Sequence, residues 1–157
     1  MSLAVPSTSA VNGAPLRIAV VAARYNEPLV DALLRRVLAG LRAAGVKERR
    51  VAVVRVPGSH EVPVAAAVQA RPRRVDCVIG LGVLIGGDTR HHEMVGQSVS
   101  HALQRVALDS RVPVINGVIV ADTVAQARAR CTGRIDRGAE FAQAAVAMAA
   151  LKRKFSR

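Results

Sequence analysis

The most informative segment of this chain reads GVLIGGDTRHHEMV and runs from Gly82 to Val95. An apolar segment leads into a Gly-Gly turn, followed by an acid, a hydroxyl, a guanidinium, two imidazoles and a carboxylate. Backbone N–H groups at a glycine turn and at a helix start can hold an anion, and an imidazole can transfer protons near neutral pH. The stretch therefore predicts a buried strand, a turn and a helix, with an active site where they meet.

The rest of the chain alternates between short apolar runs and helical patterns. The runs typical of buried strands cover residues 16–23, 51–56, 75–85 and 112–120. The helical patterns cover residues 26–45, 60–70, 91–108, 123–131 and 137–154. Because a crossover between parallel strands needs a helix to return the chain, this alternation predicts a parallel sheet wound on both sides. We expect an α/β fold, a three-layer flavodoxin-like sandwich whose mainly parallel, four-stranded sheet is flanked by helices.

Three residues are expected to set the ends of these helices. Asn26 should cap the first helix with its side chain, and Gly45 should end it. Pro63 fits only in the first turn of the second helix, because a proline deeper in a helix removes a hydrogen bond and clashes with the preceding turn.

The length and composition suit one domain with a full core. We expect a single domain over residues 16–157, preceded by a flexible arm over residues 1–15, which are mostly small or polar and include Pro6 and Pro15. The composition is 51% hydrophobic but only 2% aromatic, so the core must consist of Val, Ala, Leu and Ile. This mixture is favoured where helices cover both faces of a sheet.

Targeting signals and cysteine usage indicate the compartment. No apolar run reaches the roughly 18 to 20 residues that a bilayer helix needs, and residues 1–15 lack the basic start and apolar middle of a secretory signal. Cys77 and Cys131 are too few for a disulfide scaffold and too far apart for a metal-binding pair. We expect a cytoplasmic protein with no membrane partner, whose cysteines are small core or surface residues.

The net charge of +12 raises the question of an anionic partner. Many basic residues are scattered singly, and the denser groups, residues 47–50, 71–74 and 152–157, are short. Nucleic-acid modules usually combine such charge with aromatic stacking platforms, whereas this chain has one Tyr, two Phe and no Trp. We expect a solvated or assembly-facing basic surface and no specific nucleic-acid partner.

Polar clusters follow all the expected strands, at residues 24–26, 57–61, 86–93 and 121–123. In open α/β sheets, ligands gather at the carboxyl ends of the strands, where the strand order reverses. These loops are therefore expected to converge on one rim of the sheet.

The loop of residues 86–89, GGDT, allows two interpretations. Its glycines let the backbone approach a ligand, and the Thr89 hydroxyl can join N–H groups in holding phosphate. Alternatively, it is a plain turn in which Asp88 or Thr89 caps the next helix. His91 and His92 diverge by about 100° on a helix, so we expect only one of them to face a site. A His-His-Glu metal site is not favoured, because helical metal ligands lie three or four residues apart.

The other candidate residues each allow a structural alternative as well. Glu61 at a helix start can bind sugar-like hydroxyls or simply interact with the helix dipole. Tyr25 can stack on a planar heterocycle or form a lid over the core. Arg130 and Arg137 suit bidentate phosphate capture, but in a basic chain either can be surface charge.

Taken together, these clusters resemble the lumazine synthase family over residues 16–151, nearly the whole expected domain. The resemblance is based on Arg24-Tyr25-Asn26, on VPGSHEVP at 56–63, on the stretch 82–95 and on VPVINGVIVADTVAQARAR at 112–130. Four motifs in the family's order are far more specific than any one of them.

The resemblance implies condensation of 5-amino-6-ribitylaminouracil with 3,4-dihydroxy-2-butanone 4-phosphate to 6,7-dimethyl-8-ribityllumazine, the penultimate step of riboflavin biosynthesis. It implies small-molecule substrates and neither a metal nor an organic cofactor. His91 matches the family's proton-transfer histidine. The positions matching uracil- and ribityl-binding residues are Tyr25, Asn26, Ser59, His60, Glu61, Leu84, Ile85 and Asn116.

The resemblance also implies a phosphate pocket and an assembly. The matching phosphate-binding positions are Gly87, Asp88, Thr89, Arg130 and Arg137, the last in the place of a residue that is usually lysine. Asn116, Arg130 and Arg137 are expected from a neighbouring subunit. Family members form pentamers or icosahedral shells of pentamers, and riboflavin synthase is a further candidate partner. The short loop 132–137 favours a shell, whereas a proline-containing arm disfavours one.

Two positions depart from the family pattern. Gly86 replaces Arg or Lys, and His92 replaces Phe or Tyr. The alternative function is therefore a catalytically weak, shell-forming or flavin- or lumazine-binding homologue.

Overall fold

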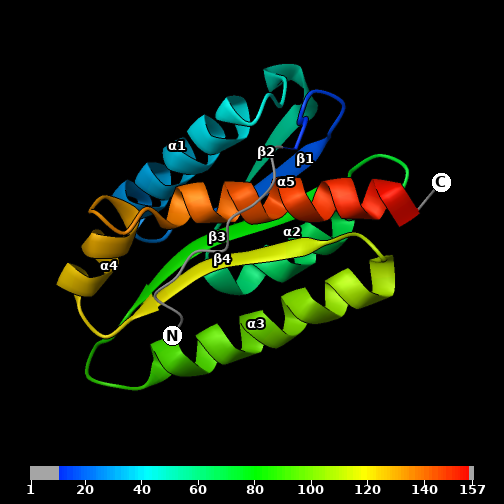
Figure 1. The fold of residues 1–157 in the computed structure, drawn as a ribbon. Coiled ribbons are helices and arrows are strands. Elements are labelled where there is room, and N and C mark those ends of the chain that lie inside the picture. The colour runs from blue at the N-terminus through cyan, green and yellow to red at the C-terminus, as the bar shows by residue number, and fades with distance from the viewer. Residues whose placement is uncertain (1–10, 156–157) are drawn as a thin grey trace.

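The computed structural model describes residues 11–155, in which four parallel strands form one sheet (Figure 1). The strands are β1 (Ile18–Ala23), β2 (Val51–Val56), β3 (Cys77–Ile85) and β4 (Val114–Ala121). Their order in the sheet is β2-β1-β3-β4. The chain therefore reverses its direction of winding between β1 and β3, which places a crevice at their carboxyl ends.

Helices cover both faces of this sheet. α1 (Glu27–Ala43), α4 (Val124–Cys131) and α5 (Arg137–Phe155) pack on one face, and α2 (Val62–Gln69) and α3 (His91–Ser110) on the other (Figure 1). In β1, Ile18 and Val20 face the first group, whereas Ala19 and Val21 face the second. The predicted three-layer α/β fold is confirmed, because β1 is buried on both faces.

The predicted element boundaries lie close to the observed ones, and two local predictions hold. Pro63 lies in the first turn of α2, which follows the short 3-10 helix η2 (Ser59–Glu61); a second, η1 (Glu48–Arg50), precedes β2. Gly45 follows α1 with a φ of 85°, and its N–H donates to the Arg42 carbonyl at 2.9 Å. A left-handed residue ends a helix in this way because it redirects the chain while still pairing the last carbonyls.

The predicted side-chain cap of α1 is wrong. Asn26 does occupy the position before α1, but its side chain makes no capping hydrogen bond and its φ is 56°. Instead, Asn26 Nδ2 donates to the Val83 carbonyl at 2.9 Å. Asparagine tolerates this left-handed conformation better than most residues. Its side-chain amide, which does not cap the helix, instead links the loop after β1 to β3.

The predicted arm, residues 1–15, lies largely outside the described residues. Within residues 11–15, Gly13 is buried and its N–H donates to the Ala44 carbonyl at 3.0 Å. Cys77 and Cys131 are both free and buried. Within the described range, none of the helices combines the length and the apolarity needed to cross a bilayer.

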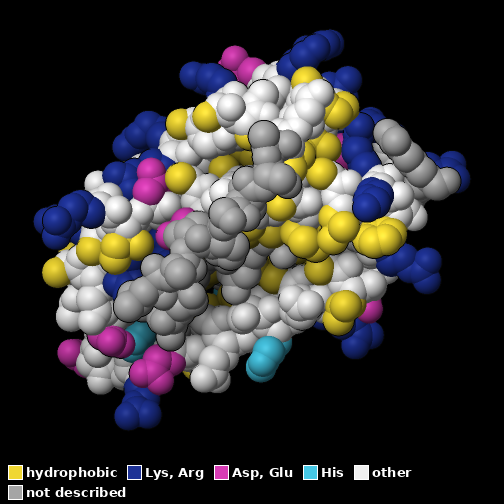
Figure 2. Space-filling model, viewed as in Figure 1, with side chains coloured by type: hydrophobic (Ala, Val, Ile, Leu, Met, Phe, Trp, Pro, Cys, Tyr) yellow, Lys and Arg dark blue, Asp and Glu magenta, His cyan; other side chains and the backbone are white. Residues whose placement is uncertain are grey.

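The outer face of α5 and β4 is partly apolar. In Figure 2, hydrophobic side chains extend across the middle of this face, whereas Lys and Arg gather in separate groups around its margin. Met148, Leu151 and Phe155 of α5 are exposed by 40–78%, and Val120, which points towards α3 on the other side of the sheet, is 42% exposed at the β4 edge. Since β4 is an edge strand that pairs only with β3 in the described sheet, this face suits contact with another subunit.

Candidate active site

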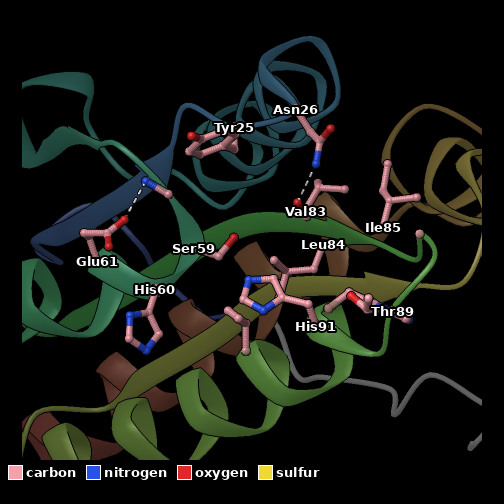
Figure 3. Close-up of a pocket in the computed structure, with 14 residues that line it drawn as sticks. Tyr25, Asn26, Ser59, His60, Glu61, Val83, Leu84, Ile85, Thr89 and His91 are labelled. Carbon is pink, nitrogen blue, oxygen red and sulfur yellow. Dashed lines mark hydrogen bonds between the residues drawn. The ribbon is translucent and has the colours of Figure 1, made fainter.

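A pocket of about 480 Å³ opens at the carboxyl ends of β1 and β3. Three segments build it: the loop after β1, the segment after β2, and the end of β3 with the start of α3 (Figure 3). It is lined by Tyr25, Asn26, Gly58, Ser59, His60, Glu61, Val83, Leu84, Ile85, Gly87, Thr89, His91, His92 and Val95. The predicted rim is thus confirmed for three loops. The fourth loop, residues 121–123, lies beside it, because the Gly86 N–H donates to the Ala121 carbonyl at 2.8 Å.

Most of the residues expected at the site line this pocket. Four do not, namely Asp88, Asn116, Arg130 and Arg137. Asp88 lies in the loop at the pocket's edge, whereas the other three belong to β4, α4 and α5. Those three are the residues expected from a neighbouring subunit, so a single chain does not test that expectation.

The loop after β1 presents an open aromatic ring. Tyr25 is 73% exposed, so the alternative that it forms a lid over the core is wrong. Its backbone N–H donates to the Pro57 carbonyl at 3.1 Å, which joins this loop to the segment after β2. The ring is therefore held at the pocket while its surface stays available for stacking.

Beyond β2, the Glu61 carboxylate has a structural role as well as a place in the pocket. Its Oε2 accepts a hydrogen bond from the Gly58 N–H at 2.8 Å, which closes the Pro-Gly-Ser turn (Figure 3). Glu61 remains exposed, and its Oε1 accepts no hydrogen bond from the described residues. The carboxylate can therefore hold the turn with one oxygen and accept from a ligand hydroxyl with the other.

Ser59 carries a buried hydroxyl with no hydrogen bond. The residue is 4% exposed, and its Oγ has no partner among the described residues. It packs against β3 where Gly82 lies; a Cβ on Gly82 would come within 2.3 Å of that Oγ. A buried hydroxyl without a partner is costly unless a ligand supplies one.

Between β3 and α3, the helix start is left without a side-chain cap. Arg90 occupies the capping position without a side-chain hydrogen bond, so the alternative that Asp88 or Thr89 caps α3 is wrong. Thr89 instead lines the pocket. An uncapped helix start beside a hydroxyl is suited to binding an anion.

His91 and His92 differ in exposure although both touch the pocket. His91 is exposed, whereas His92 is 8% exposed and its Nε2 lies 3.6 Å from Asp122 Oδ1. We expected only one of the two histidines to face the site; this is wrong, because both of them line the pocket. Only His91 can reach a ligand freely, because the His92 ring is enclosed.

The pocket contains no basic side chain beyond its histidines, within the part of the chain that the structure describes. Arg130 donates from Nη1 to the Gln126 carbonyl at 2.9 Å, and Arg137 pairs with Glu140. An anionic ligand here would therefore find backbone N–H groups and hydroxyls but no guanidinium or ammonium group from the same chain.

Sequence reasoning missed four lining residues, Gly58, Val83, His92 and Val95. Gly58 belongs to the quoted Pro-Gly-Ser turn, and Val83 lies two positions from Ile85 on the same strand face. Val95 lies one helical turn from His91. The spacing of these three residues from recognised site residues is enough to predict that they line the pocket. The position of His92 in the pocket depends instead on tertiary packing.

An open, parallel α/β sheet with a ligand pocket at its topological switch point, an exposed imidazole and an uncapped helix start defines an enzyme of the α/β sandwich class. The profile of the family described as 6,7-dimethyl-8-ribityllumazine synthase matches residues 15–153. The chain belongs to this family, whose members are transferases of riboflavin biosynthesis.

Proteins named 6,7-dimethyl-8-ribityllumazine synthase are similar to this chain over nearly its whole length. One from Albidiferax ferrireducens is 40% identical over 145 residues, which cover 92% of this chain and 90% of that protein. One from Pyrococcus furiosus is 42% identical over 142 residues, covering 90% and 88%. One from Cupriavidus metallidurans is 40% identical over 143 residues, covering 91% and 83%. Family membership implies small-molecule substrates and an oligomeric assembly.

Proposed function

We propose that this pocket carries out the condensation of 5-amino-6-ribitylaminouracil with 3,4-dihydroxy-2-butanone 4-phosphate to 6,7-dimethyl-8-ribityllumazine, phosphate and water. A substrate amine attacks the ketone and loses water to give an imine, phosphate is then eliminated, and the ribitylamino nitrogen attacks the remaining carbonyl and loses a second water to close the ring. Support comes from the family match over residues 15–153 and from the gathering of most of the expected site residues around one pocket.

The pyrimidine substrate binds at the β1 and β2 side of the pocket in this proposal. The exposed Tyr25 ring stacks on the heterocycle, and the backbone at the end of β3 contacts its edge. The ribityl hydroxyls face Ser59 and Glu61, which offer an unpaired hydroxyl and a free carboxylate oxygen. His60 lines the same side.

His91 transfers the protons. It is exposed, lies in the pocket and belongs to the first turn of α3, beside Thr89. Carbinolamine collapse, phosphate departure and ring closure each need a proton moved, and a neutral imidazole offers both a donor and an acceptor.

The proposal that two subunits share this site depends on one observation, the lack of a Lys or Arg side chain among the described residues that line the pocket. A phosphate substrate placed at Gly87, Asp88 and Thr89 meets no Lys or Arg of its own chain among the described lining residues. We infer that Arg130 and Arg137, with Asn116 on the exposed edge strand β4, reach this pocket from a neighbouring subunit. The apolar face of α5 and β4 supports such a contact.

For the assembly, we propose a ring of five subunits. Head-to-tail contacts between one chain's pocket and its neighbour's β4 generate a closed ring. The short loop between α4 and α5 favours further assembly of such rings into an icosahedral shell. Riboflavin synthase, which takes the lumazine product, is a candidate partner, and a cytoplasmic location stays a prediction.

Lumazine fluorescence measures the activity directly. Purified protein is mixed with both substrates, and the appearance of the fluorescent product is compared with the uncatalysed reaction. A rate above the uncatalysed one supports the proposal. A rate equal to the uncatalysed one would favour the alternative, a homologue that binds ligand or forms a shell but catalyses weakly. Two replacements in this chain motivate that alternative: Gly86 stands in place of a basic residue, and His92 in place of an aromatic one.

Mixed assemblies test the shared site. His91→Ala and Arg130→Ala chains are each expected to form slow homo-oligomers. When both are co-expressed in equal amounts, about one quarter of the interfaces combine an intact His91 with a neighbour's intact Arg130, so about one quarter of the activity returns. If Arg130 served its own chain's pocket, no intact site would form and the mixture would stay slow.

A further inference from the structure

His92 is an enclosed imidazole without a hydrogen bond. Its side chain is 9% exposed, and neither Nδ1 nor Nε2 has a hydrogen-bond partner among the described residues. A buried ring nitrogen left in this state loses its water without gaining a replacement. The assigned reaction gives this ring no role, so its environment calls for another explanation.

Two carboxylates lie close to the His92 ring. Ligand atoms of His92, Glu93 and Asp122 all lie within 4.8 Å of one another. The distance from His92 Nε2 to Asp122 Oδ1 is 3.6 Å, which is too long for a hydrogen bond. Nitrogen and oxygen ligands that lie about 2.0–2.2 Å from a tetrahedral zinc ion are roughly 3.3–3.6 Å from each other. The observed separation therefore suits two ligands of one ion better than a direct contact.

The backbone holds Asp122 in this place. Its N–H donates to Gln126 Oε1 at 2.8 Å, and its carbonyl lies so close to Gly86 that a Cβ there would come within 2.6 Å of it. Gly86 thus lets the end of β3 approach the residue that faces His92. The carboxylate of Asp122 accepts no hydrogen bond from the described residues and is 76% exposed, so an ion can enter from solvent past this side chain.

We propose that His92, Glu93 and Asp122 bind a divalent first-row transition-metal ion of the zinc type. One imidazole nitrogen and two carboxylate oxygens match the ligand preference of such an ion, whereas magnesium and calcium favour oxygen ligands alone. The two carboxylates balance its double charge. Three protein ligands leave a fourth position for water or for an anionic oxygen at the margin of the pocket, which His92 also lines.

The spacing of residues along the sequence does not predict this metal site. Spacing on α3 alone offers no pair of ligands three or four residues apart, which is why no metal was expected from the sequence. The third ligand comes from the end of β4, 29 positions beyond Glu93. An ion bound there ties the start of α3 to the end of β4, so it should raise thermal stability as any ligand of the folded state does.

Cobalt(II) and zinc are the probes for this site. The untagged, assembled protein is titrated with CoCl₂ while visible d–d absorption is recorded, and with ZnCl₂ by calorimetry and thermal unfolding. We expect one ion per chain, an absorption typical of four-coordinate cobalt, and a higher melting temperature with zinc. His92→Phe and Asp122→Asn should each weaken binding by at least about 100-fold and remove the thermal shift.

His101→Ala is the matched control, because His101 is an exposed histidine on the same helix. This variant should bind cobalt like the original chain. The proposal is overturned if the original chain binds less than one ion per chain, or if Asp122→Asn binds as tightly as the original chain. It is also overturned if binding is lost in His91→Ala but kept in His92→Phe. Because Asp122 is exposed, its variant remains informative even if His92→Phe folds poorly, and none of these results depends on the proposed enzymatic activity.

Discussion

Replacing Ser59 by alanine should stabilise the unliganded protein and weaken its binding of the uracil substrate. The Ser59 Oγ is buried without a hydrogen-bond partner in the described part of the chain, and Gly82 of β3 approaches it too closely for a side chain on that residue. A buried hydroxyl that lacks a hydrogen bond costs about 1–3 kcal/mol of stability. Alanine removes that hydroxyl and retains the Cβ, so the free energy of unfolding should rise by about 1 kcal/mol or more.

The corresponding thermal shift is measurable. For a chain of 157 residues, 1 kcal/mol corresponds to roughly 2–4 °C in melting temperature. Ser59→Ala and the original chain are compared by calorimetry at equal protein concentration and scan rate, since an oligomer's melting temperature depends on concentration. Ser98→Ala, at an exposed position inside α3, is the control; it should gain only the helix propensity of alanine, about 0.5 kcal/mol, so its melting temperature should rise less than that of Ser59→Ala.

The same variant should lose affinity for 5-amino-6-ribitylaminouracil. If the Ser59 hydroxyl pairs with a ribityl hydroxyl, loss of that hydrogen bond costs about 0.5–1.5 kcal/mol, or roughly a 2- to 12-fold increase in the Michaelis constant. A lower melting temperature in Ser59→Ala would refute the reasoning about the unpaired hydroxyl. An unchanged Michaelis constant would show that the hydroxyl does not face the substrate.

Three further predictions concern other parts of the chain. Arg130→Ala should reduce kcat/KM for the butanone phosphate by about 10- to 150-fold, because a charge-assisted hydrogen bond contributes about 1.5–3 kcal/mol; an unchanged value would place the guanidinium elsewhere. His91→Ala should slow turnover in the lumazine fluorescence assay by up to about 100-fold, near the lower limit of general acid–base contributions, whereas a slower His92→Ala would contradict the assigned roles. Burial raises the pKa of the Cys77 thiol to about 12, so at pH 9–10 iodoacetamide should label it in urea but not in the native protein. Because this pKa is raised in the folded state, the thiol's contribution to stability is complete below the unfolded-state pKa of 9.0 and is lost as the pH rises towards 12. If Cys77→Val loses as much stability between pH 9 and pH 12 as the original chain does, this explanation is contradicted.

Local patterns in the sequence specify the layering of this protein and the rim of the sheet at which its pocket opens. Apolar runs and helical spacing are local patterns, and β1 and α1 formed where these patterns lay. Gly45 and Pro63 acted as expected because each restricts or permits a backbone conformation by its own covalent structure. The convergence of the loops on one rim followed from parallel strands, whose carboxyl ends share one edge of the sheet.

The pairing of side chains depends on the packing of the whole fold. Asn26 donates a hydrogen bond to Val83, 57 residues away, instead of capping its own helix, and the Ser59 hydroxyl is buried against β3 with no partner within residues 11–155. His92 meets Asp122 because β3 and β4 pair in a register that places Ile85 opposite Ala121. Such contacts depend on the alignment of whole strands and on the burial of each side chain, and neither quantity is encoded in the local spacing of residues.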